Sequence, residues 1–337
     1  MSMFCNQCQE ALNNTACTVN GVCGKKASTA NLEDLLTFVS KGIAVVSVEA
    51  DIISNETGKR LFEDLFTCVT NVTFDDKDLI ARIENTIKLR DELKAQFGIT
   101  GEGEHDSVNW TPSSTDELLA KAEEVTIGES DNDDVRSLRE LLIYGLRGIG
   151  AYGEHALVLG HEDSDLYMKV AKLLASTTKD ISVDEMIAAV METGEAAVTT
   201  MALLDKANTE TYGNPEISEV NLKVGSKPGI LISGHDLKDI KMLLEQTKGT
   251  GIDVYTHGEM LPAHFYPEFK GYDNFVGNYG NAWWDQQKDF ENFNGVILMT
   301  TNCIVKPKSS YIDKIYTTGM VRFEGVTHID GDENGHT

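Results

Sequence analysis

The sequence has little positive charge and no long apolar run. Its 337 residues include 29 lysines and arginines against 54 aspartates and glutamates, which gives a formal net charge of −25. Nucleic acids and anionic membrane surfaces repel such a chain, so we expect neither as a partner. No run of about 18 apolar residues is present, so we expect no transmembrane helix.

The start of the chain lacks the features of a secretion signal. The opening MSMFCNQCQE has neither a basic segment nor an apolar one. Because cysteines stay reduced inside the cell, we expect a cytoplasmic location. Apolar residues make up 41% of the chain, which is enough to fill the cores of two domains.

Four of the six cysteines lie within the first 23 residues. They are Cys5, Cys8, Cys17 and Cys23, with the spacing C-x2-C-x8-C-x5-C. Four thiolates on a short loop can surround one soft metal ion or one iron–sulfur cluster. Disulfides fit a reduced compartment poorly. Structural zinc remains an alternative, but it usually uses two C-x2-C pairs, so the spacing favours an iron–sulfur cluster.

The first two thirds of the chain have helical periodicity. Leu32, Leu35, Leu36 and Val39 recur at i, i+3, i+4 and i+7. Further helices are expected at residues 56–70, 76–97, 115–125, 133–159, 164–176 and 183–207. We therefore expect a cluster-binding segment over residues 1–24 and a helical bundle domain over residues 25–220.

The expected helix at 133–159 is the richest in leucine. Its apolar residues form one broad face: Val135, Leu138, Leu141, Leu142 and Leu146. The same stretch contains four glycines, Gly145, Gly148, Gly150 and Gly153. These glycines either let another helix approach closely or weaken the helix locally, and the sequence leaves both alternatives open.

After Pro215 the pattern changes to short apolar runs separated by helical or irregular segments. Strands are expected at residues 229–233, 252–257, 274–279, 295–301 and 314–320. Strands that alternate with helices predict a doubly wound, Rossmann-like parallel sheet, which we place at residues 221–337. The expected fold class is therefore α + α/β. In such sheets, ligands bind outside the carboxyl ends of the strands.

Side chains that bind metals follow several of these strands. His235 comes after the first strand, Glu259 after the second and Cys303 after the fourth. Each has an ordinary alternative, since His235 or Glu259 could cap a helix and Cys303 could be a small core residue. Their shared position at one sheet edge favours a common site. Cys68, in contrast, lies in an apolar helical stretch and is expected in the core.

Long motifs resemble those of the hybrid cluster proteins, also called prismane proteins or hydroxylamine reductases. The motifs include MFCNQCQEALNNTACTVNGVCGK, GILISGHDLKDIKMLLEQTKGTGIDVYTHGEMLPAHFYP and the TTNC segment. The resemblance implies that Cys5, Cys8, Cys17 and Cys23 hold a [4Fe–4S] cluster with the anaerobe-type spacing. It also implies that His235, Glu259 and Cys303 bind part of a hybrid [4Fe–2O–2S] cluster.

The resemblance further implies an activity: reduction of hydroxylamine to ammonia and water with two electrons and two protons, with nitric oxide reduction as a further possibility. A small nitrogen-oxide substrate and a redox donor protein would be the partners. Two alternatives stay open. One is an electron-transfer or nitric-oxide-sensing iron–sulfur module without turnover, and the other is a relative of carbon monoxide dehydrogenase.

The chain departs from this family at its C-terminal end. Family members continue into a third domain with further cysteine, glutamate and lysine residues, whereas this sequence ends at VTHIDGDENGHT. We therefore expect an incomplete ligand set for the hybrid cluster. The chain would then be a fragment, a frame-shifted product or a subunit completed by another chain.

Overall fold

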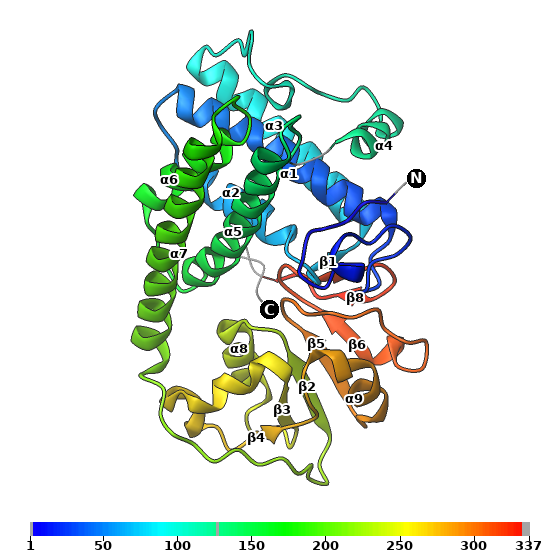
Figure 1. Cartoon of the computed structure of the whole chain (residues 1–337). Coiled ribbons are helices and arrows are strands. Elements are labelled where there is room, and N and C mark those ends of the chain that lie inside the picture. The colour runs from blue at the N-terminus through cyan, green and yellow to red at the C-terminus, as the bar shows by residue number, and fades with distance from the viewer. Residues whose placement is uncertain (1–2, 126–127, 332–337) are drawn as a thin grey trace. The chain divides into compact units, whose positions relative to one another are not determined.

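The computed structural model describes residues 3–125 and 128–331. The chain divides into two compact units (Figure 1). The first contains residues up to 69 together with 75–204, and the second contains residues 70–74 together with those from 205 onward. The second unit therefore begins before the expected boundary at residue 220, and it also takes a short segment from early in the chain. A separate role for residues 1–24 stays a prediction.

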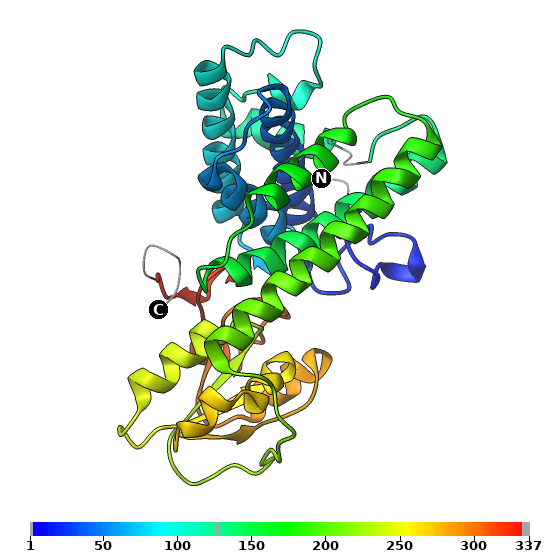
Figure 2. The ribbon, with the colours of Figure 1, turned by 90° about the vertical axis from the view of Figure 1, so that its left-hand side faces the viewer.

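The first unit is helical, as expected. Its α-helices are α1 (Ala27–Glu49), α2 (Asn55–Thr67), α3 (Asp76–Phe97), α4 (Thr115–Glu124), α5 (Asp133–Leu157), α6 (Ser164–Ser176) and most of α7 (Val183–Tyr212). Two short 3-10 helices are η1 (Leu12–Asn14) and η2 (Asp106–Val108). Side chains cap several of these helices; for example, Ser54 accepts a hydrogen bond from the Thr57 amide, and Asn132 accepts from the Asp134 amide. Figure 2 shows the long helix α7, in green, along its length.

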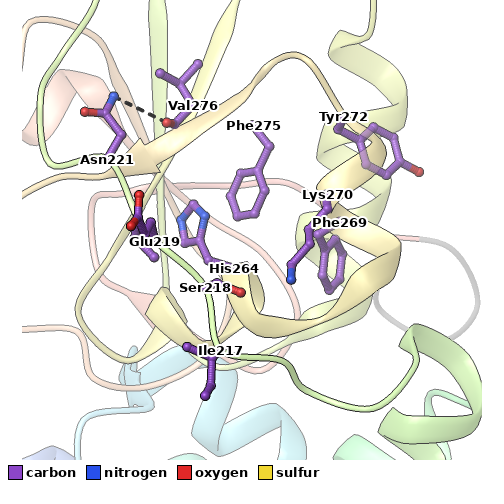
Figure 3. Close-up of a pocket in the computed structure, with 11 residues that line it drawn as sticks. Ile217, Ser218, Glu219, Asn221, His264, Phe269, Lys270, Tyr272, Phe275 and Val276 are labelled. Carbon is purple, nitrogen blue, oxygen red and sulfur yellow. Dashed lines mark hydrogen bonds between the residues drawn. The ribbon is translucent and has the colours of Figure 1, made fainter.

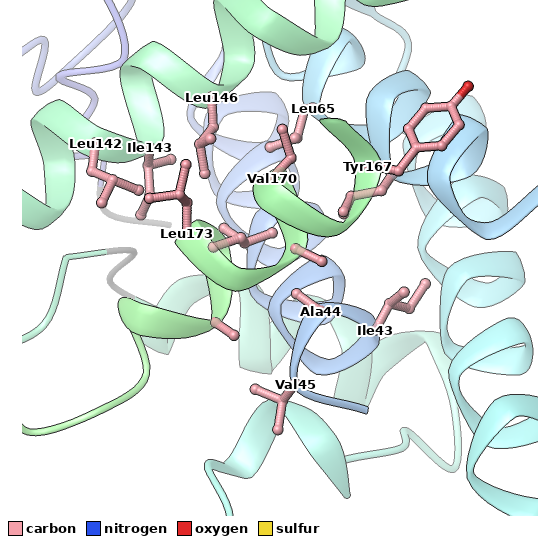
Figure 4. Close-up of a cluster of buried hydrophobic side chains, with 14 of the residues drawn as sticks. Ile43, Ala44, Val45, Leu65, Leu142, Ile143, Leu146, Tyr167, Val170 and Leu173 are labelled. Atoms are coloured by element: carbon pink, nitrogen blue, oxygen red, sulfur yellow. The ribbon is translucent and has the colours of Figure 1, made fainter. Parts of the chain in front are cut away.

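Helix α1 is central to the core of this unit and contacts α2, α3, α4 and α6. Figure 4 shows one buried cluster, with Ile43 and Ala44 from α1, Leu146 from α5 and Val170 from α6. Burial of each large apolar side chain contributes about 1.5–3 kcal/mol, so this cluster is a main source of stability. The expected α5 face is wrong at one position, because Leu141 is 52% exposed.

The sequence left open whether the glycines of α5 allow close helix packing or weaken the helix. The structure decides this at two positions, Gly150 and Gly153. A Cβ on Gly153 would lie 2.2 Å from Cε2 of Phe62, and one on Gly150 would lie 2.8 Å from the Phe62 carbonyl oxygen. Both glycines therefore allow α2 to approach α5 closely. Gly148 meets no such neighbour.

The second unit contains a parallel sheet of six strands. These are β2 (Gly229–Ser233), β3 (Asp253–His257), β4 (Phe275–Asn278), β5 (Val296–Met299), β6 (Ile315–Thr317) and β8 (Thr327–His328). Their order is β4-β3-β2-β5-β6-β8, and every pairing is parallel. Numbered along the chain from β2, this order is 3-2-1-4-5-6, that of a Rossmann sheet. The expected fold class is confirmed.

Helices connect these strands. Two are α-helices, α8 (Leu237–Thr247) and α9 (Gln286–Asn292), and four are 3-10 helices, η3 (Gly258–Phe265), η4 (Pro267–Gly271), η5 (Trp283–Asp285) and η6 (Ile312–Lys314). A further pair of strands, β1 (Thr73–Phe74) and β7 (Arg322–Phe323), forms a separate two-stranded parallel sheet. The sequence did not predict β1, β7 or β8, because two residues are too few to show a periodicity.

Helix α7 is the one helix among the described residues that is long and apolar enough to cross a membrane. Sequence inspection did not predict this, because polar residues interrupt the apolar stretch. Glu192 and Glu195 lie in its middle, and their carboxylates are 3.9 and 3.7 Å from the Lys169 ammonium. Such charges are costly in hydrocarbon. The absence of a membrane partner stays a prediction.

Candidate metal centres

The N-terminal cysteines lie on a loop that folds back on itself. Cys5 and Cys17 face each other across an antiparallel bridge, with N–H to carbonyl distances of 3.0 and 2.9 Å. Such a hydrogen-bonded pair brings the two Cα atoms to about 5.5 Å. Both residues are buried, and all six cysteines of the chain are free thiols.

The other two cysteines of the loop, Cys8 and Cys23, are half-buried. They lie close enough for the charge of Cys8 to affect the pKa of Cys23, which burial raises. Gly21 makes room for Cys23, because a Cβ on Gly21 would lie 3.0 Å from its sulfur. A turn at Gly24, with φ of +92°, then returns the chain to α1.

A buried lysine lies beside this loop. Lys25 donates a hydrogen bond to Gln7 at 2.8 Å and forms an ion pair with Glu33. Its positive charge acts on both Cys5 and Cys23 and lowers their pKa values, against the stronger effect of burial, which raises the pKa of Cys5 to about 12. The thiols of Cys5 and Cys23 are therefore protonated when no metal is bound, and a metal would have to displace these protons. The sequence analysis missed Lys25, although it lies only two residues after Cys23.

The spacing of the sulfur atoms gives a first test of what the loop fits. No three of the four sulfurs lie within 4.8 Å of one another in the described structure. Thiolates around one tetrahedral zinc ion, with Zn–S bonds of about 2.3 Å, would be about 3.8 Å apart. The four sulfurs in the described structure are therefore not arranged around a single tetrahedral ion.

The second group of candidate residues lies where the strand order reverses. In a sheet with order 3-2-1-4-5-6, this point is between β2 and β5, and ligands bind outside the carboxyl ends of these two strands. The two strand ends touch here through Gly234. With φ of +123°, a Cβ at this position would lie 2.6 Å from Thr300 Oγ1 and 2.8 Å from the Thr301 amide. Only glycine fits this close contact.

His235 follows directly and is fixed by the end of β5. Its amide donates to Thr301 Oγ1 at 2.7 Å, and its Nδ1 lies 3.0 Å from the Asn302 carbonyl oxygen. Because a carbonyl only accepts, Nδ1 carries the proton and the lone pair of the imidazole is on Nε2. This is the tautomer that binds a metal through Nε2.

Cys303 is held on the same segment by a buried glutamine. Gln286, which is 1% exposed, donates to the Cys303 carbonyl at 2.8 Å and accepts from the Val305 amide at 2.8 Å. Burial and the nearby charge of Glu259 raise the pKa of the Cys303 thiol to about 12. Glu259, on η3 after β3, is therefore within electrostatic reach of Cys303. Sequence analysis also missed Gln286.

His257 is adjacent to this site but has a structural role. Its Nε2 donates to Asp289 at 3.2 Å, and its Nδ1 lies 3.2 Å from Ser233 Oγ. The two ring nitrogens thus hold the end of β3 against β2, through Ser233, and against α9, through Asp289. Burial lowers the pKa of His257. The structure brings His235, Cys303 and Glu259 to one edge of the sheet, but no three candidate ligand atoms there lie within 4.8 Å of one another in the described residues.

Two further residues lie outside these sites. Cys68 is fully buried in an apolar cluster, and its thiol lies 3.3 Å from the Glu33 carbonyl, so its core role is confirmed. His264 stacks on Phe275 with ring centroids 3.9 Å apart and so packs against an aromatic side chain. Figure 3 shows both rings in a pocket of 460 Å³ beside β4, which is separate from His235 and Cys303.

A sequence profile described as the Prismane/CO dehydrogenase family matches residues 3–337. The chain belongs to this family. It is 54% identical to proteins named hydroxylamine reductase from Desulfitobacterium hafniense strain DCB-2 and from Clostridium novyi strain NT, over 99% of this chain and 62% of each relative. A third, from Caldanaerobacter subterraneus subsp. tengcongensis, is 52% identical over 99% of this chain and 63% of its own length. The chain thus spans slightly less than two thirds of these relatives.

Solved structures of lower similarity include carbon monoxide dehydrogenase IV from Carboxydothermus hydrogenoformans. It has a TM-score of 0.39 and 15% identity, over 97% of this chain and 51% of the other. The enzyme from Thermococcus sp. AM4 has a TM-score of 0.38 and 14% identity, over 98% of this chain and 52% of the other. Membership of the prismane family confirms the resemblance seen in the motifs, and the fold assignment rests on the strand order described above.

Proposed function

We propose that this chain carries the cluster-binding part of a hydroxylamine reductase. The reaction is NH₂OH + 2 H⁺ + 2 e⁻ → NH₃ + H₂O. The observation that carries the proposal is the placement of His235 and Cys303 at the switch point of a Rossmann sheet, with Glu259 within electrostatic reach. The names of relatives at 52–54% identity support the same reaction.

In this proposal, Cys5, Cys8, Cys17 and Cys23 hold a [4Fe–4S] cluster, which supplies one-electron transfer when bound. Two of the four cysteines are half-buried and two are buried, so one side of the loop is accessible to an electron donor. Lys25 places a positive charge beside the thiolates and offsets part of their negative charge. A protein donor and a cytoplasmic location belong to the proposal.

His235, Glu259 and Cys303 are proposed as ligands of the hybrid [4Fe–2O–2S] cluster, whose iron offers a position for a small nitrogen oxide. Each ligand is positioned by a group of this chain. The Asn302 carbonyl sets the tautomer of His235, and Gln286 holds the backbone at Cys303. Three donors are few for a four-iron cluster, so we expect weak loading of this site and low turnover by the chain alone.

The experiment is anaerobic reconstitution with iron and sulfide, followed by metal analysis, EPR and hydroxylamine-dependent oxidation of a reduced viologen dye. We expect Cys8→Ser to lose the loop-bound iron while Cys68→Ala, a buried cysteine outside both sites, keeps it. We expect His235→Ala and Cys303→Ser to lose any iron above the four of the loop, together with turnover. His161→Ala, which changes a half-buried histidine just after α5, should keep both.

Two outcomes would contradict the proposal. Stoichiometric zinc with no iron after anaerobic handling would rule out an iron–sulfur cluster at the cysteine loop. The assignment of His235 and Cys303 as cluster ligands would be wrong if iron content and turnover were unchanged in both His235→Ala and Cys303→Ser. This outcome does not depend on what the cysteine loop binds.

A further inference from the structure

A group of charged side chains lies beside the cysteine loop, out of contact with solvent. Lys25, two residues after Cys23, is 1% exposed and forms an ion pair with Glu33 of α1, which is 0% exposed. A second, largely buried pair lies next to it, where the Arg147 guanidinium of α5 is 3.6 Å from the Asp34 carboxylate. Two positive and two negative charges are thus gathered next to the loop.

Gln7, a buried residue of the cysteine loop, joins the two ion pairs. Its Nε2 donates to Asp34 Oδ1 at 2.9 Å, and its Oε1 accepts from the Lys25 ammonium at 2.8 Å. The Lys25 carbonyl accepts a further hydrogen bond from the Gly21 amide at 2.8 Å. Hydrogen bonds from the loop itself therefore fix the position of these charges relative to the cysteines.

Stability alone does not account for the pair of Lys25 and Glu33. A buried ion pair is often no more stable than apolar side chains of the same volume, because both charges lose their hydration. Glu33 also leaves one carboxylate oxygen, Oε1, buried without a hydrogen-bond partner among the described atoms, which adds to the cost. The pair therefore calls for a role besides packing.

The two charges act on the cysteines with opposite sign and unequal strength. Burial has the largest effect on the Cys5 thiol and raises its pKa; the charge of Lys25 lowers this pKa, and the charge of Glu33 raises it by less. The same order holds for the pKa of Cys23. Burial opposes the charge of Lys25 itself, but Glu33 and the two cysteines outweigh it and raise its pKa. Lys25 is therefore charged, and its effect dominates at the loop.

We propose that the Lys25–Glu33 pair sets the reduction potential of the group that the cysteine loop binds, with Lys25 raising the potential and Glu33 lowering it. This rests on the proposed function, in which four free thiols hold a [4Fe–4S] cluster. Reduction of such a cluster adds one electron and therefore one negative charge. A nearby positive charge stabilises the reduced form and a negative charge destabilises it, and buried charges are little screened by salt. Lys25 and Glu33 thus act through the cysteines and need not bind the cluster themselves.

The test is a dithionite titration of the reconstituted chain with redox mediators, which follows the EPR signal of the reduced loop cluster. A Cys303→Ser background removes strand-end iron, so the loop is titrated alone. Lys25→Met should lower the equilibrium constant for reduction at least about tenfold, which is about 59 mV for a one-electron couple. Glu33→Gln should raise the potential, because it removes negative charge and keeps an acceptor for the Lys25 ammonium.

The double variant Lys25→Met/Glu33→Leu separates the effect of charge from that of stability. It replaces the ion pair by two apolar side chains, so it should recover most of the stability that Lys25→Met loses. Its potential should nevertheless stay below that of the wild type and above that of Lys25→Met, because Lys25 has the larger effect of the two charges. A wild-type potential in this variant would mean that the pair acts through stability alone.

Two control variants remove charges of the same sign elsewhere in the helical unit. Glu49→Gln changes an exposed carboxylate 16 residues (49 − 33) further along α1, which is about 24 Å along the helix axis. Lys88→Met changes an exposed ammonium on α3. Both should keep the wild-type potential.

Two kinds of failure can be told apart by metal analysis before the titration. An iron-loaded loop whose potential is the same in wild type and Glu33→Gln, or lower in Glu33→Gln, would overturn the role of the pair and leave the proposed function intact. This comparison holds even where Lys25→Met loses its iron. A wild-type loop that binds no iron would overturn both.

Discussion

The cysteine loop and the strand-end site gather metal-binding side chains in different ways. The loop brings together four cysteines that lie between positions 5 and 23, and a backbone bridge between Cys5 and Cys17 closes it. The strand-end site takes His235, Glu259 and Cys303 from the ends of three strands, which the pairing of β2 with β3 and with β5 brings together. The first depends on local turns and the second on the whole sheet.

This difference predicts how each site fails. A change in sheet register moves side chains to the opposite face, so the strand-end site is sensitive to any defect at the β2–β5 contact. The loop does not share that contact. Variants that damage one site and spare the other therefore test the comparison directly.

The largest effect is expected from Gly234→Ala. The new Cβ would lie 2.6–2.9 Å from three atoms of Thr300 and Thr301, in a backbone conformation with φ of +123°. Backbone strain and overpacking together should lower the free energy of unfolding by about 3–5 kcal/mol. Denaturant unfolding measures this loss, and metal analysis should show loop iron retained while strand-end iron is lost. Gly148→Ala, which meets no neighbour, is the matched control.

Lys25→Met should damage the cysteine loop and spare the strand-end site. It should lower the free energy of unfolding by about 3 kcal/mol. It leaves Glu33 buried without its ion-pair partner and removes the hydrogen bond to Gln7. Iron should then be lost from the cysteine loop first. If strand-end iron fell as much as loop iron, the two sites would not be independent.

Acid should weaken the strand-end region through His264, which lies on the same 3-10 helix as Glu259. Burial lowers its pKa from 6.5 to about 4. Because the folded-state pKa is the lower one, the unfolded chain takes up the proton first. The stabilisation is complete above pH 6.5 and is lost as pH falls toward 4. Partial exposure reduces the effect to about 2 kcal/mol.

The measurement for His264 is denaturant unfolding between pH 7 and pH 4, with tryptophan fluorescence as the probe. His264→Gln should have a flatter pH dependence than the wild type. An unchanged slope in this variant would assign the acid sensitivity to other groups.

Cys68→Ala should lower the free energy of unfolding least, by about 1 kcal/mol, because it removes one buried sulfur from an apolar cluster. Iron content should stay at the wild-type level. Loss of loop iron in this variant would mean that Cys68 takes part in the site despite its distance along the sequence.

Sequence reasoning found both sets of candidate ligands but not the groups that position them. Spacing alone identified the four cysteines, and His235 was visible because parallel strands end at one edge. Gln286 and Lys25 carry no such signal, since their roles depend on backbone groups and carboxylates that only the fold brings near. Leu141 shows the same limit, because helical periodicity gives a face but not its edge.

The pairing of β1 with β7 also has a consequence for folding during synthesis, because β1 is made long before its partner. Thr73 pairs with Arg322, so 249 residues (322 − 73) separate the partners. At a synthesis rate of about 5–20 residues per second, β1 leaves the ribosome roughly 12–50 seconds before β7. During that interval Phe74 lacks its packing partner Phe323; in the folded chain the two ring centroids are 5.4 Å apart. The later part of the helical unit, residues 75–204, is made in the same interval, so the helical unit is complete before β7 is made.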